Sequence, residues 1–207
     1  MTRSWVGAHV LMTGDSVTDC GRRTDPAGLG HGYVRLLAEG PLRDARVTNT
    51  GVGGDRLADL AARWDADVLD REPDLLSVLI GVNDTWRRFD TGLPSPVAEF
   101  ESTYRDLIDR LHARRPDAVV VLVEPFVLPV VLEQHRWWPE DLAARVDVVH
   151  RLAADHDAVL VPAHTHLTAL AADRDPVHLA ADGVHPTDVG HHELADLWWR
   201  TVSAARS

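Results

Sequence analysis

The chain has 207 residues, of which 45% are hydrophobic and 26% charged; this balance is typical of a globular protein and excludes disordered and fibrous classes. The formal net charge is −11 and no long block of Lys and Arg is present, so no nucleic-acid partner is expected. The single cysteine, Cys20, excludes an internal disulfide and is expected to be a small buried side chain.

The length suits one domain spanning residues 1–207. The first residues, MTRSWVGAHV, lack the apolar core of a signal peptide, and no apolar run approaches the length of a membrane span. We therefore expect a cytoplasmic protein without a membrane partner.

Short apolar runs alternate along the chain with longer segments of helical spacing. The apolar runs predict five strands, at residues 8–13, 45–50, 74–80, 118–125 and 158–162. Apolar residues at steps of three and four predict helices with single apolar stripes: Leu57, Leu60, Trp64 and Val68; Val97, Phe100, Tyr104, Leu107, Ile108 and Leu111; Val189, Leu194, Leu197, Trp198 and Val202.

This alternation predicts the α/β class, with a parallel sheet of about five strands covered by helices on both faces. In such folds ligands bind beyond the carboxyl ends of the strands. Functional side chains should therefore directly follow strands in the sequence.

Polar and glycine-rich segments do follow three of the predicted strands. Ser16 follows the first, the segment GVGGDR (51–56) the second and GVNDTW (81–86) the third. Asp182 and His185 lie three residues apart in a loop before the last predicted helix. Each segment alone has an ordinary explanation as a turn, a helix cap or a solvated loop, but together at one sheet edge they indicate a catalytic site.

These are the residue types that serine hydrolysis requires. A serine hydroxyl becomes a nucleophile when a histidine takes its proton, and a carboxylate holds the imidazole in the required tautomer. The attacked carbonyl develops negative charge, which preorganised N–H donors must meet. A glycine amide, an asparagine side chain and the serine's own amide are suitable donors.

Four segments, TGDSVTD, NTGVGGD, IGVND and DGVHP, resemble in order and spacing the four sequence blocks of the SGNH, or GDSL, hydrolases. The resemblance implies a flavodoxin-like three-layer α/β/α sandwich and no cofactor. It implies that Ser16 is the nucleophile, Asp182 the orienting acid and His185 the base. The G-x-S-x-G motif of the α/β-hydrolases is absent around Ser16.

The same resemblance implies an oxyanion hole. The Ser16 amide, the Gly54 amide and the Asn83 side chain would meet the developing charge. Gly53 is the alternative to Gly54 if the alignment shifts by one residue.

A closer resemblance concerns the substrate. The stretches DSVTDCGR, GLGHGYV, LADLAARWDADVL and IGVNDTWRRFD are similar to intracellular SGNH acetylesterases that deacetylate xylan-derived sugars, and also to SGNH proteins known only as lipases or esterases. Asp15, Trp86 and Arg87 are candidate substrate-binding residues, because an aromatic ring suits the apolar face of a sugar. For Trp86 a core position is an open alternative.

Trp137 and Trp138 lie in a long segment after the fourth predicted strand. Three interpretations are open: a substrate rim, a subunit contact of a homo-oligomer, or a packed lid.

The chain contains 12 histidines, but their spacing does not indicate a metal site. The pairs His164/His166 and His191/His192 lack the H-E-x-x-H spacing of a zinc enzyme, so no metal is expected. His191 and His192 are expected in the first turn of the last helix.

Together, the residues and the resemblance predict a serine ester hydrolase that acts through an acyl-enzyme. The expected substrate is a small acylated molecule, above all an acetylated xylo-oligosaccharide or related sugar. A broad short-chain esterase, lipase or thioesterase is the alternative within this class. A non-catalytic ligand-binding domain on the same fold is the alternative outside it.

Overall fold

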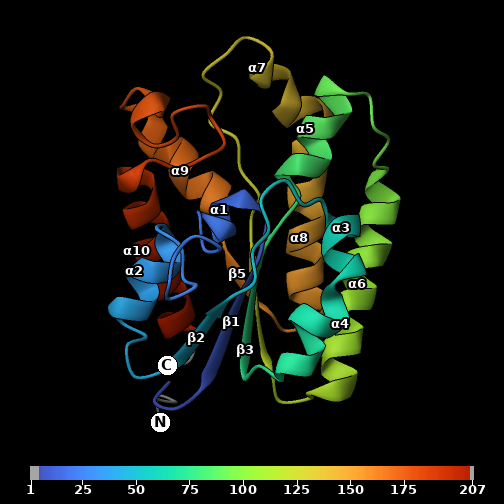
Figure 1. Cartoon of the computed structure of the whole chain (residues 1–207). Coiled ribbons are helices and arrows are strands. Elements are labelled where there is room, and N and C mark those ends of the chain that lie inside the picture. Colours follow the sequence, from blue (N-terminus) through green and yellow to red (C-terminus); the bar gives the residue numbers. More distant parts are fainter. Residues whose placement is uncertain (1–4, 206–207) are drawn as a thin grey trace.

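The computed structural model describes residues 5–205, in which one five-stranded sheet forms the centre (Figure 1). Neighbouring strands pair in parallel, in the order β2-β1-β3-β4-β5. The strands are β1 (His9–Gly14), β2 (Arg46–Asn49), β3 (Leu75–Leu79), β4 (Val119–Val123) and β5 (Val159–Val161). This is the strand order of flavodoxin-like sheets, and the predicted fold class is confirmed.

Helices cover both faces of the sheet, because alternate strand residues supply two separate cores. In β1, Val10 and Met12 belong to one core and Leu11 to the other. The first core packs against α2 (Tyr33–Glu39), α9 (Ala163–Ala172) and α10 (Asp188–Ala204). The second packs against α3 (Leu57–Ala62), α4 (Trp64–Asp67), α6 (Val97–Arg114) and α8 (Ala143–Asp155), on the opposite face in Figure 1.

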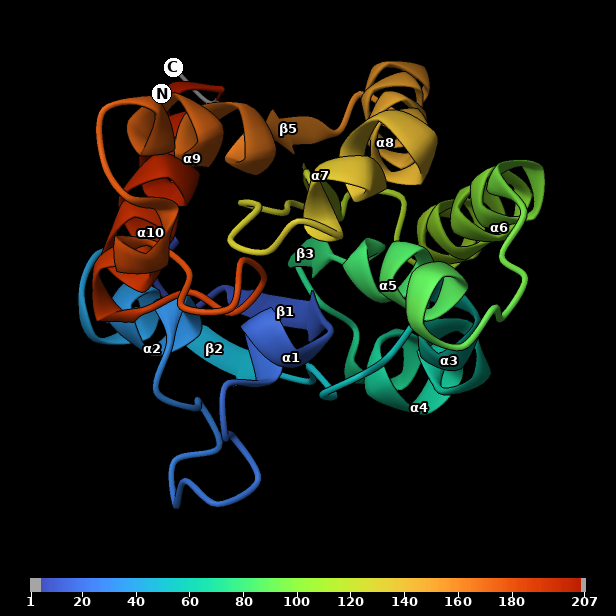
Figure 2. The same ribbon diagram turned by 90° about the horizontal axis from the view of Figure 1, so that it is seen from above.

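Short elements gather at the carboxyl ends of the strands. They are α1 (Ser16–Asp19), α5 (Val82–Asp90), α7 (Gln134–Trp137) and the π-helical turn η2 (Trp138–Leu142). Figure 2 looks down on this edge and shows α1, α5 and α7 around the ends of β1 and β3. The strand order reverses between these two strands, which is where such sheets bind ligands. The single turns η1 (Leu69–Arg71) and η3 (Pro176–His178) complete the structure.

The structure corrects three details of the sequence prediction. The predicted strand 118–125 ends at Val123, two residues before Pro125, which has no N–H to donate to a neighbouring strand. The predicted helix through Leu57 and Val68 is two short helices, α3 and α4, separated at Arg63. Cys20 is only partly buried, with a φ of +38°, so it is not a simple core residue.

Among residues 5–205, no helix combines the length and the apolar character needed to cross a membrane.

Candidate active site

Ser16 opens α1 directly after β1. Gly14 ends β1 with a φ of +147°, and a Cβ atom at this position would collide with the carbonyl oxygen of Leu79 on β3. Asp15 then caps α1, because its Oδ1 accepts a hydrogen bond from the Val17 amide at 3.0 Å. The cap holds Ser16 at a helix N-terminus, where its amide lies outside the helical hydrogen-bond ladder.

The imidazole of His185 lies between the Ser16 hydroxyl and the Asp182 carboxylate. Ser16 Oγ is 2.9 Å from His185 Nε2, and Asp182 Oδ2 is 2.6 Å from His185 Nδ1. The side chains of His185 and Asp182 are 45% and 49% exposed. The fold thus brings the three residues together at an open surface, in the arrangement by which a carboxylate orients an imidazole toward a hydroxyl.

The Asp182 carboxylate is held by its own loop. Its Oδ1 accepts hydrogen bonds from the amides of Val184, at 3.0 Å, and His185, at 2.7 Å. Burial acts to raise the pKa of Asp182, but the hydrogen bonds from His185 and Val184 outweigh it and lower the pKa below its usual range. Asp182 is therefore ionised at neutral pH, as an acid that orients a histidine must be.

Gln134, a residue that sequence reasoning missed, ties this loop to the segment after β4. Its Nε2 donates to the Asp182 carbonyl at 2.6 Å, and its Oε1 accepts from the Val130 amide at 2.9 Å. The Leu128 amide adds a hydrogen bond to the Gly183 carbonyl at 2.7 Å. Gly183 has a φ of +85° and no room for a Cβ atom beside Gln134. A lone glutamine has no sequence signal, because its partners are backbone groups.

The candidate oxyanion donors lie at three neighbouring strand ends. Ser16 follows β1, Gly54 follows β2, and Asn83 is in the first turn of α5, after β3. Among residues 5–205, the amides of Ser16 and Gly54 donate to no protein acceptor, so both are available to a ligand. The Gly53 amide donates to Asp19 Oδ2 at 2.9 Å, which favours Gly54 over Gly53 as the donor.

Asn83 is the third candidate donor, and one hydrogen bond to the backbone holds its side-chain amide in place. One hydrogen of Nδ2 is donated to the Asp55 carbonyl at 3.0 Å, and the second is left for a ligand. Asn83 is 3% exposed, so its amide group has little rotational freedom. Rigid placement is what an oxyanion donor needs.

Asp15 does not reach the surface on which a substrate could lie. It is 1% exposed, its Oδ1 caps α1, and its Oδ2 has no hydrogen-bond partner within residues 5–205. The expected direct contact with substrate therefore does not hold, because the side chain turns inward to satisfy the helix start. Burial raises the pKa of Asp15 from 3.8 to about 7.

A raised carboxyl pKa makes stability depend on pH. The folded state holds the Asp15 proton more tightly than the unfolded chain, so this contribution is present below pH 4 and is lost as the pH rises to about 7. We expect Asp15→Asn, which keeps the cap, to gain stability relative to the wild type between pH 5 and pH 8 in urea unfolding. The exposed Asp106→Asn is the control; an equal pH dependence in wild type and Asp15→Asn would contradict the prediction.

Trp86 lies beside His185, the candidate base, and also packs against the small hydrophobic cluster around Trp137. Its ring centroid is 6.1 Å from that of His185 and 5.3 Å from that of Trp137. Arg87 lies over the Trp86 ring at 5.5 Å and pairs with Asp90. Trp86 is partly buried, so the core and substrate-contact interpretations are compatible in this structure.

The two adjacent tryptophans of the segment after β4 are packed. Trp137 is 3% exposed, which excludes it as a substrate rim or a subunit contact. Trp138 stacks on His164 with the ring centroids 3.8 Å apart. Asp141 anchors η2 by accepting hydrogen bonds at 2.7 Å from Thr85 of α5 and from Arg145 of α8. Of the three interpretations, a packed segment over the site agrees with the structure.

Two other histidines, His164 and His191, are buried away from the Ser16–His185 pair. His191 Nδ1 accepts from the Tyr33 amide at 3.2 Å, and its Nε2 lies 3.4 Å from Cys20 Sγ. Burial lowers the pKa values of His164 and His191 to about 4. His191 and His192 lie within the first five residues of α10. Among residues 5–205, no three side chains of the metal-binding types gather as ligands would.

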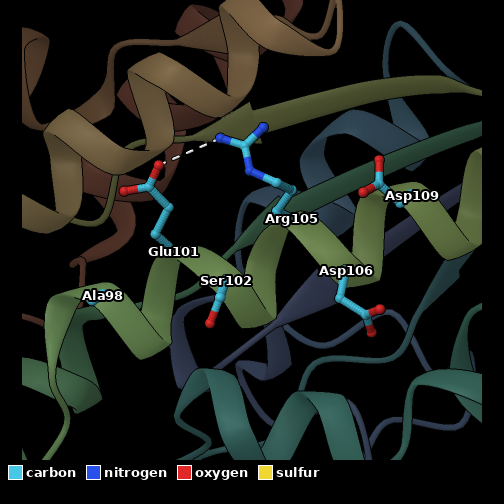
Figure 3. Close-up of a pocket in the computed structure, with 6 residues that line it drawn as sticks. All are labelled: Ala98, Glu101, Ser102, Arg105, Asp106 and Asp109. Atoms are coloured by element: carbon cyan, nitrogen blue, oxygen red, sulfur yellow. Dashed lines mark hydrogen bonds and ion pairs between the residues drawn. The ribbon is translucent and has the colours of Figure 1, made fainter.

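A hollow of about 410 Å³ lies elsewhere, on the solvent face of α6. It is lined by Ala98, Glu101, Ser102, Arg105, Asp106 and Asp109. Figure 3 shows Glu101 and Arg105 on the same side of the helix, where they pair with each other. Arg105 also pairs with Asp155, and Glu101 with Arg151. Glu101 and Arg105 are thus already paired in this hollow, whereas the candidate nucleophile, base and acid meet at the sheet edge.

Comparison with known proteins agrees with the geometry at the sheet edge. The model of the GDSL-like Lipase/Acylhydrolase family matches residues 12–193. The chain belongs to this family. As a GDSL acylhydrolase it is a carboxylic ester hydrolase, which decides against a non-catalytic binding domain.

Individual GDSL relatives are similar over nearly the whole chain. An acetylxylan esterase from Geobacillus stearothermophilus is 33% identical over 95% of this chain and 94% of its own. The crystal structure of Axe2, an acetylxylan esterase from Geobacillus stearothermophilus, superimposes with a TM-score of 0.84 at 31% identity, and the match covers 96% of each chain. A GDSL-like lipase from Parabacteroides merdae superimposes with a TM-score of 0.87 at 28% identity, again over 96% of each chain.

Proposed function

We propose that this GDSL hydrolase removes acetyl groups from xylo-oligosaccharides or related small sugars. The contact that carries the proposal is the 2.9 Å approach of Ser16 Oγ to His185 Nε2, since it supplies a nucleophile with its base. The relative from Geobacillus, an acetylxylan esterase, supports the substrate class. The half-exposed triad and the Trp86 ring beside it also suit a bulky alcohol portion that extends into solvent.

In the proposed mechanism, Ser16 Oγ attacks the acetyl carbonyl while His185 Nε2 takes the hydroxyl proton. Asp182 stabilises the imidazolium that forms, and the donors Ser16, Gly54 and Asn83 stabilise the negative oxygen. His185 then gives the proton to the sugar oxygen as the ester bond breaks, which leaves an acetylated serine. Water, deprotonated by His185, attacks this acyl-enzyme, and acetate leaves as Ser16 Oγ recovers the proton.

The proposal is tested by acetate release from acetylated xylo-oligosaccharides, measured beside hydrolysis of p-nitrophenyl acetate and p-nitrophenyl octanoate. We expect kcat/KM to be higher for the acetyl than for the octanoyl ester, and acetate to be released from the sugar. If the octanoyl ester is strongly preferred, the sugar substrate is wrong and the chain is a lipase. Hydrolysis of the small acetyl ester without release from the sugar would instead identify a broad short-chain esterase.

A further inference from the structure

One guanidinium group joins the end of β1 to the segment after β2, and these two places carry the candidate oxyanion donors Ser16 and Gly54. Arg63, at the break between α3 and α4, is 18% exposed. Its Nη2 donates to the Gly14 carbonyl at 3.0 Å, and its Nη1 donates to the Thr50 carbonyl at 2.6 Å. Its Nε donates to Asp55 Oδ2 at 2.7 Å, and its Nη1 also reaches Asp67 at 2.9 Å.

Two of these partners, Gly14 and Asp55, lie close to the candidate donors. Gly14 precedes the nucleophile by two residues, and its carbonyl marks the end of β1. Asp55 follows Gly54 directly, and its carbonyl accepts the fixed hydrogen of Asn83 Nδ2 at 3.0 Å. The Arg63 side chain therefore sets the spacing between the Ser16 helix, the Gly54 turn and, through Asp55, the Asn83 amide.

We propose that Arg63 is a positioning residue that holds the oxyanion hole in its working geometry. The proposal rests on the proposed roles of Ser16, Gly54 and Asn83. Oxyanion donors must lie within about 0.5 Å of their ideal positions, and a misplacement of about 1 Å can lower the rate by about 10²-fold. The planar fork of arginine reaches two carbonyls and two carboxylates at fixed angles, which the single ammonium of lysine cannot do.

The test compares Arg63→Met and Arg63→Lys with the wild type in p-nitrophenyl acetate hydrolysis. We expect kcat to fall by about 10- to 100-fold in both variants, with KM changed by less than about threefold, because the donors act on the transition state more than on the bound ester. Arg63→Lys keeps a cation beside Asp55 and Asp67, so it provides a folded variant if Arg63→Met unfolds.

Arg35→Met is the matched control. Arg35 is 26% exposed and, like Arg63, donates to a backbone carbonyl, that of Gly30, and pairs with two carboxylates, Asp25 and Glu39. It lies on α2 and touches none of the donor segments. Its replacement should lower the melting temperature in the way that Arg63→Met does, but kcat should stay within about twofold of the wild type.

The affinity for a boronic acid distinguishes misplaced oxyanion donors from a general loss of stability of the fold. Phenylboronic acid forms a tetrahedral adduct when Ser16 Oγ bonds to boron and His185 takes the proton, which places an oxygen in the oxyanion hole. We expect its inhibition constant to rise with Arg63→Lys about as much as kcat falls, and not with Arg35→Met. Combining Arg63→Lys with Asn83→Ala should cost less than the product of the two single effects, because both act on one hole.

An unchanged kcat and unchanged boronate affinity in Arg63→Lys would overturn the positioning role, provided that the wild type is active and depends on Ser16. If Arg35→Met lowers kcat as much as Arg63→Met does, the positioning role is also wrong, and Arg63 only stabilises the fold. Failure of the wild type to deacetylate sugars would count against the proposed substrate alone, since the Arg63 measurements use a small ester.

Discussion

Ser16→Ala is expected to lower kcat for p-nitrophenyl acetate by about 10⁴-fold or more. The variant keeps α1, the Asp15 cap and all three candidate donors, but it loses the oxygen that lies 2.9 Å from His185 Nε2. The oxyanion hole and the base would remain, so a small residual rate above that of water is expected. The measurement is steady-state hydrolysis, with the release of p-nitrophenol corrected for the spontaneous rate.

Ser102→Ala is the matched control for this experiment. Ser102 lies on the exposed face of α6, and its hydroxyl donates a hydrogen bond to the Glu99 carbonyl of its own helix. Its replacement should leave kcat unchanged. Rates for Ser16→Ala and wild type within tenfold of each other would end the assignment of Ser16 as nucleophile.

Asp182→Asn is expected to lower kcat by about 10³- to 10⁴-fold near neutral pH. The asparagine amide can donate a hydrogen bond to His185 Nδ1, which moves the imidazole proton to Nε2. Nε2 can then no longer accept the proton of Ser16. The low pKa of Asp182 keeps the wild-type carboxylate ionised across the neutral range, so the defect should persist from pH 6 to pH 8.

The control is Asp175→Asn, because Asp175 is an exposed acid that accepts a hydrogen bond from a nearby amide, Val177, in the same kind of cap. It should retain full activity. A variant Asp182→Asn with more than a tenth of the wild-type kcat would show that the carboxylate does not set the tautomer.

Much of the fold could be predicted because the sheet is buried on both faces. Its central strands β1, β3 and β4 are largely apolar runs, and the helices between strands carry single apolar stripes, so local sequence patterns predict the order of the elements. The positions of the proposed triad also follow from local order, because each residue comes directly after a strand or just before the last helix. Parallel strands then bring them to one edge without further information.

What the sequence could not predict depends on partners far along the chain. Arg63 bonds the Gly14 carbonyl across 49 residues, and Gln134 bonds the Asp182 carbonyl across 48. Both act on backbone oxygens, which every residue has, so no motif marks them. The inward turn of Asp15 and the burial of Trp137 were also hidden, because only the packed structure decides which way a side chain points.

The anchoring of the 182–185 loop to the segment after β4 has a consequence for how such an enzyme can diversify. In the proposed mechanism, the segments after β1, β2 and β3 activate the carbonyl, whereas proton transfer belongs to a loop that is hydrogen-bonded to residues 128–134. Substitutions in residues 128–134 can therefore alter proton transfer by His185, or the range of alcohols accepted. They need not disturb the segments that hold the acyl group.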